Sequence, residues 1–244
     1  LPAVWVSPAT GFAPRSHGIP GVESASLPGI STPLAPSPGI QMLARAAGVL
    51  NPWLGGRGEI PLSGMHRKDK TLWEIAGEKG IASAVVNWWA TWPAEDGPGL
   101  RISERAYFRI EPGGHPDREL FPPQEMWSLE SDFSRLPPPD PSAGGHPERR
   151  LEREAANMDT FHLDQAGKAW REGRLPLVAV YLNGLDLMAS SPELEDDRGA
   201  KIARDRRLVD HLDFLDREVT ALVAQARRDD FIVIEGDPGR GEGS

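Results

Sequence analysis

The feature that most constrains the fold is a pattern that occurs three times along the 244-residue chain: a segment with helical spacing of apolar residues, followed by a short apolar run. The three apolar runs are short and rich in β-branched residues, which is typical of buried strands; they are residues 81–89, 175–182 and 231–235. A segment with helical spacing precedes each run, at residues 70–79, 148–171 and 199–228. Such alternation favours a parallel sheet with helices on both faces. We therefore predict an α/β fold with a mostly parallel central sheet.

The length suits one large domain. We expect a single α/β domain over residues 1–244, with an irregular, loop-rich insertion or lid at residues 96–147. Glycine and proline clusters interrupt regular structure there: Gly113-Gly114, Pro122-Pro123, Pro137-Pro138-Pro139 and Gly144-Gly145. The chain begins at Leu1 without a signal-peptide pattern and stops in a glycine-rich loop soon after an apolar run. We therefore expect a fragment of a longer domain, and its localisation cannot be read.

Two shorter helices are predicted outside the three pairs, at residues 2–10 and 39–50. Asp69 is placed to cap the helix at residues 70–79, because aspartate at this position accepts hydrogen bonds from the first backbone amides. A single residue, Gly80, joins that helix to the first apolar run, as in the αβ unit of an α/β sheet.

Composition argues against several classes of function. The formal net charge is −9, whereas nucleic-acid binding favours a basic face, so no nucleic-acid polymer is expected as a partner. No apolar run approaches the ~18 residues that a membrane helix needs, so no membrane segment is predicted. The chain has no cysteine, which excludes disulfides and thiolate metal sites.

Residues 85–95 read VVNWWATWPAE and gather three of the eight tryptophans at the end of an apolar run. A buried indole N–H needs a hydrogen-bond partner, and a cluster of indoles at a strand exit favours the wall of a pocket. We therefore expect Trp88 and Trp89 to line a substrate cleft. The alternative is that they pack in a corner of the hydrophobic core.

Aspartates follow the other two apolar runs. Asp186 ends the stretch YLNGLD, and Asp237 follows Glu235-Gly236. Function in a parallel α/β sheet is found at the carboxyl ends of the strands. Two aspartates there can converge on a divalent metal ion. The alternative is that each aspartate caps a turn or a helix.

Four stretches in order along the chain carry a resemblance to a known family. Residues 10–19 match the pattern TG-x-x-P-x-x-HGI, and residues 72–95 are similar to LW-x-I … G … WW-x-TWPAE. Residues 181–186 look like Y-x-x-G-x-D, and residues 231–237 stand in the place of V-V-V-x-S-D-H-G. Together they resemble the alkaline phosphatase superfamily, and within it the type I phosphodiesterase/nucleotide pyrophosphatase-like proteins. The resemblance spans residues 1–105 and 175–240.

This resemblance implies an alkaline phosphatase-like fold and a metal-dependent hydrolase of small phosphodiesters or phosphomonoesters. Two divalent metals, usually zinc, flank a Ser or Thr nucleophile and neutralise the phosphoryl oxygens. The nucleophile is expected at or before Leu1, so we expect the isolated chain to be inactive. Asp186 and Asp237 match metal ligands of the family. Arg240 is a candidate phosphate clamp, with a solvated loop charge as the alternative.

Two positions depart from the family pattern. Ser190 stands where a histidine is expected after Asp186, and Pro238 stands where a histidine adjoins Asp237. Neither replaces imidazole as a zinc ligand. An oxygen-rich site with Asp186, Asp237 and Glu235 suits Mn, Mg or Ca better than zinc.

Two alternatives to the hydrolase stay open. One is a catalytically inactive relative that acts as a binding or regulatory module, which Ser190 and Pro238 favour. The other keeps the superfamily and changes the reaction to sulfatase or phosphomutase chemistry. Among the histidines, we expect the His17 ring to have a structural role, bonding the loop backbone, and His162 and His211 to lie on polar helix faces.

Overall fold

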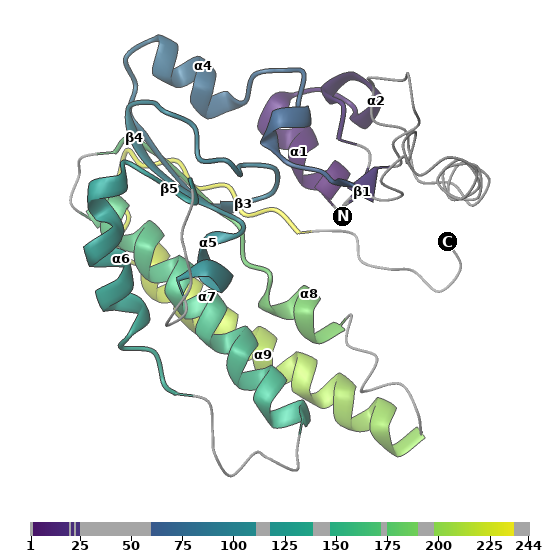
Figure 1. Cartoon of the computed structure of the whole chain (residues 1–244). Coiled ribbons are helices and arrows are strands. Elements are labelled where there is room, and N and C mark those ends of the chain that lie inside the picture. Colours follow the sequence, from purple (N-terminus) through teal and green to yellow (C-terminus); the bar gives the residue numbers. More distant parts are fainter. Residues whose placement is uncertain are drawn as a thin grey trace, which may run out of the picture. The chain divides into compact units, whose positions relative to one another are not determined.

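The computed structural model combines helices with a four-stranded mixed sheet, so the chain has an α/β fold (Figure 1). The structure describes residues 2–19, 21, 23–24, 60–110, 118–138, 147–171, 175–189 and 198–236. The chain divides into two compact units, which are described separately. The first is Leu1–Met126 with Leu175–Ala179, and the second is Trp127–Arg174 with Val180–Ser244.

The four-stranded sheet has the order β5-β4-β3-β6 and is mostly parallel, as predicted. Its strands are β3 (Ser83–Trp88), β4 (Gly99–Ser103), β5 (Leu120–Phe121) and β6 (Leu177–Val180). β3 pairs with β4 in parallel, and β4 pairs with β5 antiparallel. A second, two-stranded antiparallel sheet joins β1 (Glu23–Ser24) to β2 (Ile60–Pro61).

Strand β3 forms the centre of the first unit. The side chains of Ala84, Val85 and Val86 are fully buried, which confirms the buried strand predicted at residues 81–89. Val85 packs in a core cluster with Ala9 and Trp73. The apolar composition of β3 is explained by this cover on its faces.

Helix α4 (Leu72–Glu78) precedes β3, at the position predicted from the sequence. Its cap is Thr71, so the expectation that Asp69 caps the helix was wrong. The Glu74 amide donates to Thr71 Oγ1 at 3.4 Å, and the Glu74 carboxylate accepts from the Thr71 amide at 2.6 Å. This reciprocal capping box satisfies two free amides at once. Gly80, with φ of 76°, ends the turn after the helix.

Short helical segments complete the first unit. Helix α1 (Pro2–Thr10) has the bounds predicted from the sequence. The others are α2 (Pro14–His17), η1 (Gly64–His66), α5 (Ala106–Arg109) and η2 (Pro123–Glu125).

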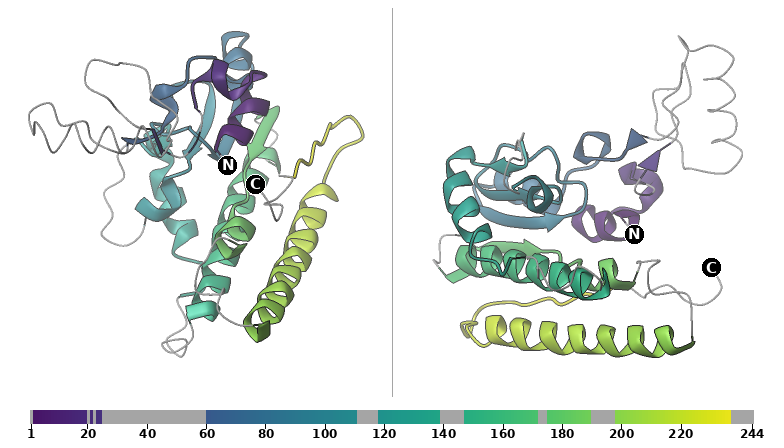
Figure 2. Two further views of the ribbon diagram at one scale, coloured as in Figure 1. Left: turned by 90° about the vertical axis from the view of Figure 1, so that its right-hand side faces the viewer. Right: turned by 60° about the horizontal axis from the view of Figure 1, so that its bottom comes forward.

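Four helices build the described part of the second unit: α6 (Met126–Phe133, whose first residue ends the first unit), α7 (Pro147–Arg171), α8 (Gly184–Ala189) and α9 (Arg198–Val223). The long helices α7 and α9 lie side by side, and α8 packs against both (Figure 2). Met158 and Phe161 of α7 are almost fully buried. The two long helices were predicted from their apolar spacing, although α9 ends five residues before the predicted limit of 228.

The third predicted strand is absent. Residues 231–236 are outside any strand, and Phe231 and Ile234 have exposed fractions of 91% and 74%. A β-branched run becomes a strand only when a neighbouring strand takes up its amides and carbonyls, and no described strand pairs with this segment.

Strands β4 and β5 lie within residues 96–147, where the sequence pattern indicated no regular element. The helix expected at residues 39–50 falls outside the described residues. None of the described helices is long and apolar enough to span a membrane.

Candidate functional site

The tryptophan-rich turn after β3 is held by the Glu104 carboxylate. Glu104 Oε2 accepts hydrogen bonds from the amides of Thr91 and Trp92, at 3.1 and 2.9 Å. Burial raises the pKa of Glu104 above its usual value, while these donors lower it in part. The Arg105 guanidinium lies over the Trp92 ring at 3.9 Å, a cation–π contact that fixes the outer end of the turn.

Within this turn, Trp88 and Trp89 pack on the apolar core of the first unit. Trp88 Nε1 donates to the Trp5 carbonyl at 2.9 Å, and the Trp88 ring meets Trp5 and Trp73 edge-on, with centroids 6.1 and 5.8 Å apart. Trp89 packs on the cluster that contains Val6. This packing is that of a core corner, and a role for the two indoles in a substrate cleft stays a prediction.

Ser7 and His17 form a pair that superficially suits nucleophilic catalysis. Ser7 Oγ lies 3.2 Å from His17 Nε2, but His17 Nδ1 accepts from the Ile19 amide at 3.2 Å. The proton of the neutral ring is therefore on Nε2, which donates to Ser7 Oγ, while Ser7 donates to the Ala3 carbonyl at 2.9 Å. His17 cannot act as a base toward Ser7 in this arrangement. Burial lowers the pKa of His17, which favours the neutral ring, and the expected bond to loop backbone is confirmed.

Asp186 lies in the first turn of α8, directly after β6. The start of that helix is anchored by Asp159 of α7, whose Oδ1 accepts from the Gly184 amide at 3.0 Å. Asp159 Oδ2 lies 2.9 Å from His211 Nε2, and both side chains are buried. His162 is also fully buried. The expectation that His162 and His211 lie on polar helix faces was therefore wrong, because each ring faces the packed interior of its helices.

The described residues do not by themselves form a metal centre. No group of three or more His, Cys, Asp or Glu side chains among them is arranged to hold a metal ion. Glu235 is exposed. The other residues predicted at the site lie outside the described residues: Ser190, Asp237, Pro238 and Arg240. A metal ion on Asp186 would thus need further ligands beyond this described set.

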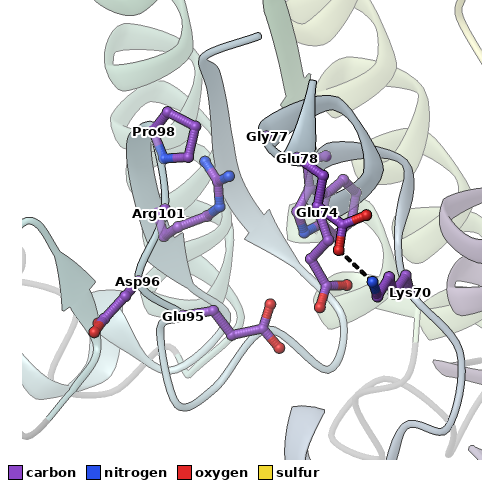
Figure 3. Close-up of a pocket in the computed structure, with 10 residues that line it drawn as sticks. Lys70, Glu74, Gly77, Glu78, Glu95, Asp96, Pro98 and Arg101 are labelled. Atoms are coloured by element: carbon purple, nitrogen blue, oxygen red, sulfur yellow. Dashed lines mark hydrogen bonds and ion pairs between the residues drawn. The ribbon is translucent and has the colours of Figure 1, made fainter. Parts of the chain in front are cut away.

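A cavity of about 310 Å³ opens in the first unit beside α4 (Figure 3). One side is formed by Trp73, Glu74 and neighbouring residues of α4, and the other by the loop at residues 95–98 and Arg101 of β4. Four acidic and two basic side chains line it: Glu74, Glu78, Glu95, Asp96, Lys70 and Arg101.

The acidic side chains of the cavity are partly neutralised by neighbouring cations. Arg67, whose side chain is 5% exposed, donates Nη1 to Glu74 and Nη2 to Glu95 Oε1, the latter at 2.7 Å. Burial and the nearby charge of Glu74 raise the pKa of Glu95. Burial alone raises the pKa of Glu74, but hydrogen bonds from Arg67 and Thr71 hold it below its usual value. Lys70 is paired with Glu78.

This cavity was missed in the sequence. Glu74 and Glu95 belong to the stretches that carry the family resemblance, but the sequence pattern indicated a site at Trp88 and Trp89, which lie between them in the sequence. A sequence indicates a buried charged residue only where that residue interrupts an apolar run. Arg101, between Leu100 and Ile102, is such a residue.

Comparison with protein-family models, with curated proteins and with solved structures finds no match to this chain.

Proposed function

We propose that this chain belongs to a metal-dependent phosphoester hydrolase with an alkaline phosphatase-like fold, in which helices cover both faces of the sheet. The substrate is a small phosphodiester or phosphomonoester. Asp186 and Asp237 are metal ligands, with Zn or, given Ser190 and Pro238, Mn, Mg or Ca as the ion. The nucleophile is not supplied by residues 1–244.

The observation that supports this proposal is the position of Asp186. Asp186 lies, partly buried, in the first turn of α8, and a three-residue link joins that helix to β6. That helix start is held tightly, because a Cβ on Gly184 would come within 2.3 Å of Asp159 Oδ2. A carboxylate fixed at a strand end is the element that a two-metal hydrolase needs first.

Titration calorimetry of the chain with Mn²⁺, Zn²⁺ and Mg²⁺ tests the ligand assignment. We expect binding of at least one ion at micromolar metal, weakened at least about tenfold by Asp186→Asn. Asp164→Asn is the matched control, since Asp164 is exposed on α7, and it should bind like the unmodified chain. Binding that Asp186→Asn leaves unchanged contradicts the assignment.

Hydrolysis of a p-nitrophenyl phosphodiester tests the position of the nucleophile. We expect no metal-dependent turnover by residues 1–244, and turnover by this chain would show that its nucleophile lies within it. A complete lack of metal binding would instead support the alternative of a catalytically inactive relative that acts as a binding or regulatory module.

A further inference from the structure

We propose that the cavity beside α4 binds a small zwitterion, such as a free α-amino acid, with its carboxylate on Arg101 and its ammonium group near Glu95. This site lies in the first unit, whereas Asp186 lies in the second. The proposal goes beyond the hydrolase assignment and does not depend on it.

Arg101 supplies the anion-binding group. It is only 5% exposed, and its Nη1 donates to the Ser83 and Leu100 carbonyls at 2.6 and 3.0 Å. Across the described residues, neither Nε nor Nη2 has an acceptor, and no carboxylate forms an ion pair with this guanidinium. Burial without an anion is costly for a charged group, and it lowers the pKa of Arg101. A ligand carboxylate is the group that matches these N–H donors.

The carboxylates that line the cavity do not form an ion pair with Arg101, because three of them are paired with other cations. Arg67 binds Glu74 and Glu95, and Lys70 binds Glu78. Figure 3 shows the Glu95 side chain reaching toward Glu74, at a distance from the Arg101 guanidinium. No carboxylate forms an ion pair with Arg101 among the described residues, although the charges of Glu95 and Glu74 act on it across the cavity and raise its pKa in part.

The acidic wall excludes a ligand that is only anionic. One guanidinium, that of Arg67, serves two carboxylates, Glu74 and Glu95, whose side chains are 29% and 36% exposed. An unneutralised negative charge therefore remains on this wall, and it repels a phosphate or a dicarboxylate while attracting an ammonium group. A molecule with one carboxylate and one ammonium group complements both ends.

The size of the cavity agrees with a small ligand. Its volume of about 310 Å³ is at the lower end of the range of ~300–1,000 Å³ found for ligand pockets. Trp73 gives the cavity an aromatic wall, which suits the apolar side chain of an amino acid such as leucine or alanine.

Calorimetry with three probes of similar size tests the proposal: L-alanine, propionate without the ammonium group, and ethylamine without the carboxylate. We expect L-alanine to bind, and each of the other two to bind at least about tenfold more weakly. L-leucine extends the test to a larger side chain. No binding of either amino acid at ~10 mM, or equal binding of L-alanine and propionate, would overturn the proposal.

Two variants assign the binding to this cavity. Arg101→Met should abolish L-alanine binding, and Glu95→Gln should weaken it about tenfold without weakening propionate binding, because the substitution also removes a charge that repels the anion. Arg105→Met is the control, because Arg105 lies over Trp92 and does not line the cavity. Should Arg101→Met fail to fold, Glu95→Gln and the two truncated probes still decide the outcome, and L-alanine binding unaffected by Glu95→Gln would contradict the ammonium position.

Discussion

Arg67 and Glu95 are 28 residues apart in the sequence, and Arg67 Nη2 lies 2.7 Å from Glu95 Oε1. The other terminal nitrogen of the guanidinium, Nη1, donates to Glu74 and to the Asp69 carbonyl, the latter at 2.8 Å. One buried cation thus ties the start of α4 to the loop after the tryptophan-rich turn. The wall of the cavity depends on this contact.

Arg67→Met should lower the free energy of unfolding by about 2 kcal/mol, because it leaves two partly buried carboxylates beside each other without their cation. Urea unfolding monitored by tryptophan fluorescence measures the change. Lys70→Met is the matched control, since the Lys70–Glu78 pair is more than half exposed on both sides, and it should change stability by less than about 0.5 kcal/mol. Equal losses in the two variants would refute the role given to Arg67.

Gly99→Ala should destabilise the first unit by about 3 kcal/mol or more. Gly99 has φ of 113°, and a Cβ there would come within 2.1 Å of the Ser83 carbonyl oxygen. Gly80→Ala is the control that isolates backbone strain from steric overlap, because Gly80 also has a positive φ but a Cβ there would meet nothing within 4 Å. We expect this variant to lose about 1 kcal/mol of unfolding free energy. Thermal unfolding followed by circular dichroism checks the order, and a Gly80→Ala loss as large as that of Gly99→Ala contradicts it.

Asp159→Ala should destabilise the second unit by about 3 kcal/mol. Asp159 is fully buried and is the acceptor for both the Gly184 amide and His211, so the substitution leaves two buried groups without their partner. Asp164→Ala on the same helix removes an exposed carboxylate and should have little effect. Urea unfolding of both variants tests this, and similar midpoints would show that the Asp159 contacts contribute little.

Burial lowers the pKa of His162 from 6.5 to about 3. Because the unfolded chain takes up a proton that the folded chain does not, stability should decline as the pH falls from about 6.5 toward 3, by up to about 1.4 kcal/mol per pH unit. His162→Leu should reduce this slope when urea unfolding is measured at pH 7, 6 and 5. Phe161→Leu is the control, since it should lower stability at every pH and keep the slope. An unchanged slope in His162→Leu would contradict the prediction.

Local sequence signals predicted much of the secondary structure. The bounds of α1 and the positions of α4, β3, α7 and α9 follow from apolar spacing and breaking residues, which act over a few neighbours. The exposed run at residues 231–236 shows the limit of such signals, because an apolar β-branched segment is not a strand without a partner. β4 was not predicted, because a glycine and a charged residue, Gly99 and Arg101, are unusual in a central strand.

The sequence by itself determined the α/β class, the long helices and the strand that shortly precedes Asp186, because these depend on local periodicity and chain order. Only the tertiary structure decided which polar side chains meet. Arg67 reaches Glu95, Asp159 reaches His211, and Arg101 is buried without an anion. Each of these relationships joins segments that are distant in the sequence or depends on burial, and neither distance nor burial is encoded by the residues on either side.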